Sequence, residues 1–491
     1  MTRPFALIAR CCLLATPWMA REVGADAGPG LVAEPARIVL VGSDARQQLA
    51  LTRAEDAGGL HDVTRTARLT IEPSGVARVS PQGLVKPIRD GEATILAEHE
   101  GRSIRIPILV RDSAVSRPPS FRRDVMAVLS NSGCNTGPCH GNINGKGGFR
   151  LSLRNDDPTF DWLSMTHEGL GRRIDLADPS RSLAVLKPAG LAVHEGGRRF
   201  AMDSPEASAL IGWIADGARD DGAGAGKLRQ LRVRPERLLL SAPDLAQQLV
   251  VTAEFADGTS RDVTGLATYE VSDPSRVNVS ADGLVTIATP GEAAVSVRYL
   301  SGRGTSRLSF VADRPDYAWD GPEPRNALDR AVFDQLRARK IRPSPVANDA
   351  TLLRRVFLDA IGVLPTPEEA RSFLDDPAPD KRARLVDRLL EREEFADFWA
   401  LKWADLLRNE EKTMGEKGAW AFQRWLREQF LADRPLDAFA RDLITGQGST
   451  WQHPSASFHR ANRDPESAAE AFGQVFLGVR LQCALPQSPV R

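Results

Sequence analysis

Cys134, Cys139 and His140 are the residues with the most distinctive chemistry in this sequence. Four residues separate the two cysteines, and the histidine directly follows the second one. A Cys pair followed by His can attach a c-type haem, because the thiols add to the haem vinyl groups and the imidazole becomes an axial iron ligand. The usual attachment loop has two residues between the cysteines. The motif alone therefore leaves two interpretations open, namely covalent haem c or a local disulfide in a secreted protein.

Zinc is a third interpretation of the same residues. Cys134, Cys139, His140 and one distant histidine would supply four ligands. Structural zinc sites usually combine two ligand pairs that are well separated in sequence, and that separation is missing here.

A haem that transfers electrons needs a second axial ligand, which is usually His or Met. The segment around the motif contains five candidates: Met126, Met165, His167, His194 and Met202. His194 follows Lys187-Pro188 and precedes the last predicted helix of the segment, where a distal loop is expected. We therefore expect His194 to be the distal ligand, with Met202 as the alternative. An exposed loop histidine is the other role open to His194.

Two helices are predicted to frame the motif, within residues 117–222. Ser120 is a suitable N-cap for the first, which ends before Gly133. A glycine-rich stretch, 141–148, follows the motif and gives the backbone freedom to fold tightly over a flat ligand. Ser204-Pro205 opens the second helix with a cap and a proline at the first position. Small c-type cytochromes have this order of elements.

Composition and charge limit the classes of function. Lys+Arg and Asp+Glu both number 64, so the net charge of zero gives no global field for binding nucleic acid. Residues 1–27 have the basic and short apolar features of a signal peptide, and no apolar run in the sequence is long enough to span a bilayer. We therefore expect an extracytoplasmic protein, in the periplasm or at the cell surface, with no transmembrane segment beyond the signal peptide.

An internal repeat flanks the predicted haem segment. His61-Asp62-Val63-Thr64 recurs as Arg261-Asp262-Val263-Thr264, and later landmarks keep the same spacing. Short alternating segments separated by Gly, Asp and Pro turns surround both copies, which predicts two small β-sandwiches at 31–112 and 231–314. These domains are candidates for contact with a cell-surface polysaccharide or protein.

Helical periodicity dominates after residue 325. Thr366-Pro367-Glu368-Glu369 predicts a capping box. One apolar helix face is expected in 395–407, and a second is expected to contain Trp420, Phe422, Trp425 and Phe430. The predicted fold class is thus two all-β sandwiches flanking an all-α cytochrome c-like domain, followed by an α-helical domain at 325–484.

The pattern from Phe121 to Phe149 resembles a family of large exported planctomycete-type proteins. These proteins join bacterial Ig-like domains of the group 2 type, a cytochrome c-like module and helical domains of unknown function. The likeness continues through His194, Gly196-Gly197 and the stretch 213–218, and 356–369 resembles the family's helical domain. The resemblance implies one covalent haem c on Cys134 and Cys139 with His140 as proximal ligand.

The C-terminus departs from the resemblance. Family members that share 478–484 continue into a second Cys-His motif, whereas this chain reads Leu-Pro-Gln-Ser-Pro-Val-Arg over 485–491. We therefore expect a truncated helical domain and an aberrant tail that arose by a single-base frameshift, which leaves Cys483 without a site.

The expected function is haem binding and one-electron transfer to an unidentified redox partner, rather than stand-alone catalysis. The rival function is that of a non-redox surface or carbohydrate-binding scaffold with a Cys134–Cys139 disulfide.

Overall fold

The computed structural model describes residues 30–54, 60–222, 224–242, 245–312 and 314–481. The predicted signal peptide, Cys483 and the predicted aberrant tail lie outside these residues. The chain falls into two compact units, whose described parts are 30–343 and 344–481. No helix among the described residues is long and apolar enough to cross a membrane.

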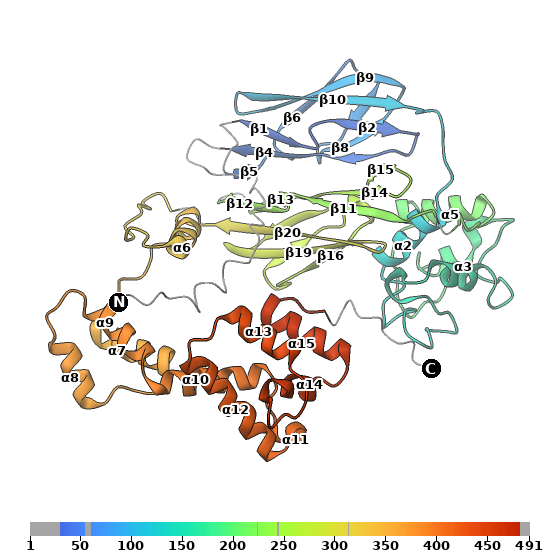
Figure 1. The fold of residues 1–491 in the computed structure, drawn as a ribbon. Helices are drawn as coiled ribbons and strands as arrows, with labels where there is room; N and C mark the ends of the chain where they lie inside the picture. Colours follow the sequence, from blue (N-terminus) through green and yellow to red (C-terminus); the bar gives the residue numbers. More distant parts are fainter. Residues whose placement is uncertain (1–29, 55–59, 223, 243–244, 313, 482–491) are drawn as a thin grey trace. The chain divides into compact units, whose positions relative to one another are not determined.

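The first unit begins with a β-sandwich. Its strands form sheets of order β1-β4-β5, β2-β10-β9-β6 and β3-β8-β7 (Figure 1). Strand β10 pairs antiparallel with β9 and parallel with β2. Alternate residues of β10, such as Ile106, Ile108 and Val110, are buried in the core. The strands are β1 (Leu31–Glu34), β2 (Ile38–Val41), β3 (Gln47–Gln48), β4 (Ala50–Ala54), β5 (Leu60–Asp62), β6 (Arg68–Glu72), β7 (Ala77–Val79), β8 (Leu84–Pro87), β9 (Gly91–His99) and β10 (Arg102–Arg111).

A second β-sandwich repeats this topology strand for strand. Its sheets have the order β11-β14-β15, β12-β20-β19-β16 and β13-β18-β17, again with one parallel pair, β12 and β20. The predicted all-β character of the N-terminal region is confirmed. The strands are β11 (Leu228–Arg234), β12 (Arg237–Ser241), β13 (Ala246–Gln248), β14 (Val250–Phe255), β15 (Ser260–Asp262), β16 (Thr268–Val271), β17 (Val277–Val279), β18 (Leu284–Ile287), β19 (Gly291–Tyr299) and β20 (Gly302–Val311).

The two sandwiches contact each other reciprocally through one carboxylate each. The Gln48 backbone N–H donates to Asp262 Oδ2 at 3.0 Å, and the Gln248 backbone N–H donates to Asp62 Oδ2. Each donor and each acceptor has its repeat equivalent on the other side, so the pairing has approximate twofold symmetry. Burial raises the pKa of Asp62, and it raises the pKa of Asp262 to about 6.

A small helical domain lies in the chain between the two sandwiches. The Ser120 hydroxyl accepts from the Arg123 backbone N–H at the first helix, and the Ser204 hydroxyl caps the last one. These two helices pack through Phe121 and Trp213, whose ring centroids are 5.1 Å apart. The helices are η1 (Phe121–Val125), α2 (Met126–Asn131), η2 (Leu153–Asn155), α3 (Pro158–Thr166), η3 (Pro179–Arg181), α4 (Leu183–Leu186) and α5 (Pro205–Ala215).

This middle domain shares one hydrophobic core with the second sandwich. The Arg123 guanidinium lies 4.1 Å from the centre of the Phe255 ring, and the Tyr299 hydroxyl donates to the Arg123 carbonyl at 2.7 Å. Arg261 also forms an ion pair with Asp124. The chain leaves the second sandwich through α6 (Ala327–Ala338).

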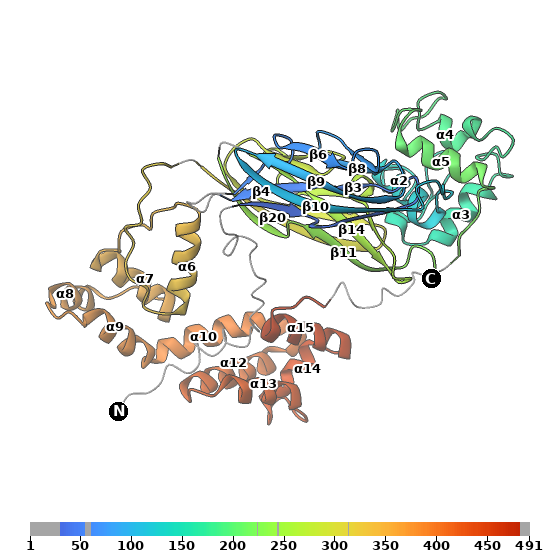
Figure 2. The same ribbon diagram turned by 90° about the horizontal axis from the view of Figure 1, so that it is seen from above.

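The second unit is entirely helical, as predicted (Figure 2). The capping box at Thr366 and Glu369 is present, with both reciprocal hydrogen bonds. The helices are α7 (Asp349–Ile361), α8 (Pro367–Asp375), α9 (Lys381–Leu390), α10 (Glu393–Leu406), α11 (Glu411–Met414), α12 (Glu416–Leu431), α13 (Leu436–Thr445), η5 (Pro454–Ala456), α14 (Ser457–Ala461) and α15 (Pro465–Leu477).

The buried face of α10 differs from the predicted one. Its fully buried side chains are Ala396, Ala400 and Ala404, whereas Leu401 and Leu406 are exposed. The prediction was wrong for Leu401 and Leu406, whereas Trp403 packs against the core and Leu407, directly after the helix, is buried. The small residues at this spacing let neighbouring helices approach closely. Trp420 is also exposed rather than part of the core.

Candidate haem-binding site

The loop between the two cysteines is held in a tight, closed shape. The His140 backbone N–H donates to the Cys134 carbonyl at 2.9 Å, and the Gly141 N–H donates to the Thr136 carbonyl at the same distance. A side chain at Gly141 would overlap the backbone of Asn135, so this closure requires glycine. The buried Asn135 amide donates to Asn155 at 2.6 Å, which fixes the loop to the following segment.

Both cysteines are free thiols and half-buried. Burial raises the pKa of the Cys134 thiol to about 11. The Arg199 guanidinium lies near the other cysteine, with Nη2 3.5 Å from Cys139 Sγ.

His140 is half-buried and fixed in one orientation. Its Nδ1 lies 2.9 Å from the Phe149 carbonyl oxygen, so Nδ1 carries the proton and donates to that oxygen. Its ring also packs on Phe149, with centroids 4.6 Å apart, and the Arg173 guanidinium lies 4.5 Å from the Phe149 ring centre. Burial lowers the pKa of His140, which keeps the imidazole neutral.

His194 lies beside His140, although 54 positions separate them in the sequence (194 − 140). The ring centroids are 6.3 Å apart, and the ring planes are inclined by only 13°. His194 Nδ1 lies 2.9 Å from the Gly197 carbonyl oxygen, so this ring too has its proton on Nδ1. In both rings Nε2 is therefore the nitrogen with a lone pair available to a metal.

Gly196 makes the position of the His194 ring possible. A Cβ at residue 196 would lie 2.8 Å from His194 Cε1, which is closer than such atoms approach in proteins. The Gly196-Gly197 pair was noted in the sequence, but its steric role beside the imidazole becomes visible only in the structure.

The other candidates for the distal ligand lie elsewhere. Met126 and Met165 are fully buried in the hydrophobic core. His167 is exposed and contacts Trp162, and its Nδ1 lies 2.7 Å from the Thr166 hydroxyl. Met202 is half-buried and packs against the core.

The described residues contain no group of three or more His, Cys, Asp and Glu side chains placed to bind a metal ion by themselves. The zinc interpretation requires Cys134, Cys139 and His140 to converge with a further histidine. The arrangement therefore does not favour zinc.

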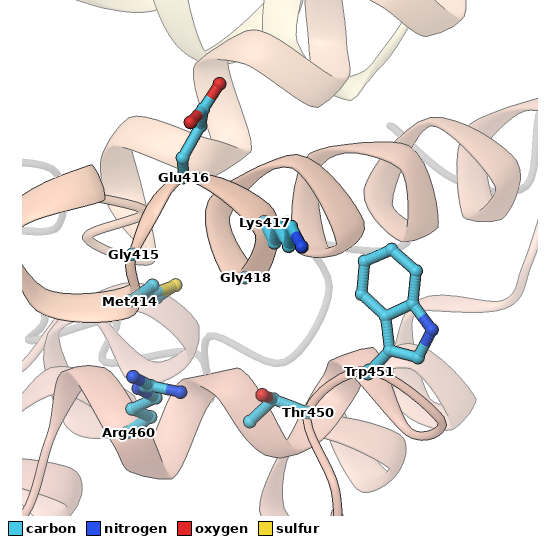
Figure 3. A pocket seen from close by; sticks show the side chains of 8 residues that line it. All are labelled: Met414, Gly415, Glu416, Lys417, Gly418, Thr450, Trp451 and Arg460. Atoms are coloured by element: carbon cyan, nitrogen blue, oxygen red, sulfur yellow. The ribbon is translucent and has the colours of Figure 1, made fainter.

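A separate hollow of about 470 Å³ lies in the helical unit (Figure 3). Trp451, Lys417 and Arg460 line it, and the Glu416 carboxylate points away from it. The Trp451 ring lies 6.3 Å from that of Trp420, with the planes inclined by 25°. Sequence analysis placed Trp420 in the core, and helical spacing alone gave no signal that it pairs with a distant tryptophan on the surface.

Comparison with known proteins gives one family match. Residues 327–485 match a family described as PSCyt2, a protein of unknown function (DUF1549). No curated protein matches the chain.

Several solved structures resemble the chain weakly. Domains 5–6 of the S-layer protein SbsC match with 12% identity and a TM-score of 0.24, over 58% of this chain and 100% of that one. The titin Ig tandem domains A164–A165 match with 8% identity and a TM-score of 0.13, over 58% of this chain and 98% of that one. The family match confirms the predicted C-terminal helical domain of unknown function, and the cytochrome c-like domain stays a prediction.

Proposed function

We propose that this chain is an exported c-type haem protein that transfers single electrons. The observation that supports it best is the pairing of His140 with His194 at 6.3 Å. Two imidazoles on opposite sides of one metal have metal–nitrogen bonds of ~2.0 Å each, which separates their ring centres by roughly 6 Å.

The residues present fit a covalent haem. Two thiols lie directly before one of the paired histidines, as haem attachment requires. Both imidazoles have Nδ1 fixed by a backbone carbonyl and Nε2 available, which is the usual condition of a histidine that binds metal. Cys134 and Cys139 would hold the haem, and His140 and His194 would be its axial ligands.

The haem would supply a reversible one-electron change at iron, at a potential set by the axial ligands and by burial. The chain's own residues fix the orientation of the two imidazoles. The Phe149 carbonyl orients His140, and the Gly197 carbonyl orients His194. Rigid ligands reduce the rearrangement that accompanies each electron transfer.

Exposed apolar side chains on the two histidine loops also support the proposal. Ile143 is 80% exposed and Val193 is 95% exposed, and each lies within three residues of a paired histidine. Apolar surface in water is unfavourable by about 25 cal/mol per Å². A large apolar ligand held at these loops would remove such surface from water.

Expression with a c-type maturation system tests the proposal. The exported protein is expected to carry haem that stays attached through denaturation and acid–acetone extraction, and Cys134→Ala with Cys139→Ala should lose it. A colourless wild-type protein with intact export would contradict the proposal.

A second candidate function is contact with a cell-surface polysaccharide, and the tryptophan pair favours it. Trp420 and Trp451 are both more than half exposed and their rings lie side by side, and Trp451 also lines the hollow. Flat, rigid aromatic surfaces of this kind can stack on sugar rings at a low cost in side-chain entropy. The Arg424 guanidinium, 5.6 Å from the Trp420 ring centre, adds a polar contact.

Affinity electrophoresis through gels that contain soluble cellulose derivatives tests this second function. The gel should retard the wild-type protein. Trp420→Ala and Trp451→Ala should each lower the affinity for the polysaccharide, as measured from this retardation, by roughly 2- to 10-fold. Leu431→Ala, an exposed apolar position of the same helix, is the matched control and should leave it unchanged. Equal mobility of the wild type and both tryptophan variants in these gels would show that the tryptophan pair does not bind sugar.

A further inference from the structure

A second hollow, of about 190 Å³, lies where the middle domain meets the second sandwich. Three arginines line it: Arg154 from η2, Arg298 from β19 and Arg303 from β20. Glu270 is the one acidic residue of the lining, and hydroxyl groups of Thr268, Ser296 and Thr305 complete it.

The sheet places two of these arginines directly opposite each other. Arg298 and Arg303 are cross-strand partners in the antiparallel β19–β20 pair. Like charges in directly opposed positions repel and destabilise a sheet. The positive charge of Arg154, together with burial as the larger cause, lowers the pKa of Arg298.

Glu270 partly offsets this repulsion, because its negative charge raises the pKa of Arg298, but no carboxylate of the described residues lies at ion-pair distance from these arginines. Neither Arg154, Arg298 nor Arg303 takes part in a salt bridge within the part of the chain that the structure describes. Arg298 Nε donates weakly to Thr268 Oγ1 at 3.4 Å, and Arg298 Nη1 is buried with no hydrogen-bond partner. An unpartnered buried donor on a charged group is costly, and most such groups in proteins do have a partner.

We propose that this hollow binds a tetrahedral oxyanion, a phosphate or sulfate group, between Arg154, Arg298 and Arg303. Guanidinium groups match the oxygens of such an anion in geometry as well as in charge. The volume equals that of about six water molecules, which is enough for the anion and part of the group that carries it. Because Arg154 belongs to the middle domain and the other two to the sandwich, the bound anion would also join the two domains.

The test is calorimetric titration of the full exported chain at low ionic strength. Inorganic sulfate and inorganic phosphate are the probes for a free ion, and dextran sulfate, with dextran as its control, is the probe for a polymer-borne ester. Saturable binding is expected for at least one of the charged probes. Chloride at matched ionic strength should give none.

Arg303→Gln and Arg298→Gln should each weaken binding at least tenfold. Arg303 is exposed, so its variant should fold even if the Arg298 variant does not. In the absence of anion, Arg303→Gln should keep or raise the melting temperature, because it removes one of two opposed like charges. Arg307→Gln, at an exposed position of the same strand, is the matched control and should bind as the wild type does.

Sulfate or phosphate binding that depends on both arginines identifies a free-ion site. Binding of dextran sulfate alone, with the same dependence, identifies an ester carried by a polysaccharide. Absence of binding by every charged probe, or equal binding by the two arginine variants and the wild type, would overturn the proposal.

Discussion

The two paired histidines owe their chemistry to backbone carbonyls rather than to charged neighbours. The Phe149 and Gly197 carbonyls both accept from Nδ1, which leaves Nε2 as the free nitrogen of each ring. Neither carbonyl could be recognised as a partner from residue types, since every residue has one. The sequence motif therefore predicts which histidine follows the thiols, while the fold determines the tautomer of both.

The distal position gives the sharpest test at this scale. In haem-loaded protein, His194→Ala should open a coordination site, so the absorption spectrum becomes high-spin and shifts again on addition of imidazole or carbon monoxide. Met202→Ala is the control and should leave the spectrum unchanged. The reverse result for the two variants would identify Met202 as the ligand.

Gly196→Ala tests the same site by adding a methyl group beside the His194 ring, whereas His194→Ala removes the ring. The new Cβ would lie 2.8 Å from His194 Cε1, so the ring must move away from its present position. We expect a mixed-spin spectrum with faster carbon monoxide binding than in the wild type. Gly224→Ala, where nothing lies within 4 Å of the added atom, is the control. A spectrum identical to the wild type in Gly196→Ala would contradict the steric role of this glycine.

At the scale of elements, helix packing depends on side-chain volume, which the hydrophobic pattern of a sequence does not take into account. Helix α10 turns a row of alanines, at 396, 400 and 404, toward its neighbours. The predicted apolar face included Trp403, which packs against the core, and also Leu401, which is exposed, because hydrophobic periodicity counts apolar character and not volume. The capping box of α8, by contrast, was predictable because its two hydrogen bonds are local.

Substitutions on the two sides of α10 should differ in effect. Ala400→Leu forces new methyl groups into a filled core, so we expect a loss of about 1–3 kcal/mol in the free energy of unfolding. Leu401→Ala, at a position that is mostly exposed, should change it by less than about 1 kcal/mol. Denaturant titration of both variants measures the difference, and a larger loss for Leu401→Ala would refute the assigned buried face.

The pairing of the two sandwiches should depend on pH through Asp262. Burial raises its pKa to about 6 in the folded state, while the unfolded value is near 4. A raised pKa means that the folded state favours the protonated acid. The contribution of Asp262 to stability is therefore fully present below about pH 4 and is lost as the pH rises through about 6.

The change amounts to about 3 kcal/mol at most, from a shift of roughly two pKa units. Asp262→Asn cannot titrate, so the difference in unfolding free energy between wild type and variant should grow in favour of the variant from pH 4 to pH 7.5. Denaturant titrations at several pH values measure this difference. A difference independent of pH would contradict the assignment.

At the scale of the whole molecule, the middle domain and the second sandwich belong to one compact unit. They share a core, and the Arg123 side chain and carbonyl both contact the sandwich. The internal repeat, whose two copies lie 200 positions apart (261 − 61), predicted both sandwiches, because a repeated strand-and-turn pattern is a local property. It gave no sign of the shared core or of the reciprocal Asp62 and Asp262 contacts, since these depend on which surfaces meet after folding.

Substitution of two buried phenylalanines, one in each unit, tests whether the two units unfold independently. Phe310→Ala, in the second sandwich, should cost about 3–5 kcal/mol and lower the temperature at which the haem absorption band changes. Phe357→Ala, in α7 of the helical unit, should cost a similar amount but leave that temperature unchanged. Equal effects of both variants on the haem band would show that the two units unfold together.

The reciprocal carboxylate contacts also bear on how the chain is held together. The middle domain is the tether between two halves that pair like the subunits of a dimer. A folded tether fixes a high effective concentration of one sandwich near the other, whereas an unfolded tether of the same length loses part of it to loop-closure entropy. Whatever keeps the middle domain folded thereby strengthens an association in which that domain's own cysteines and histidines take no part.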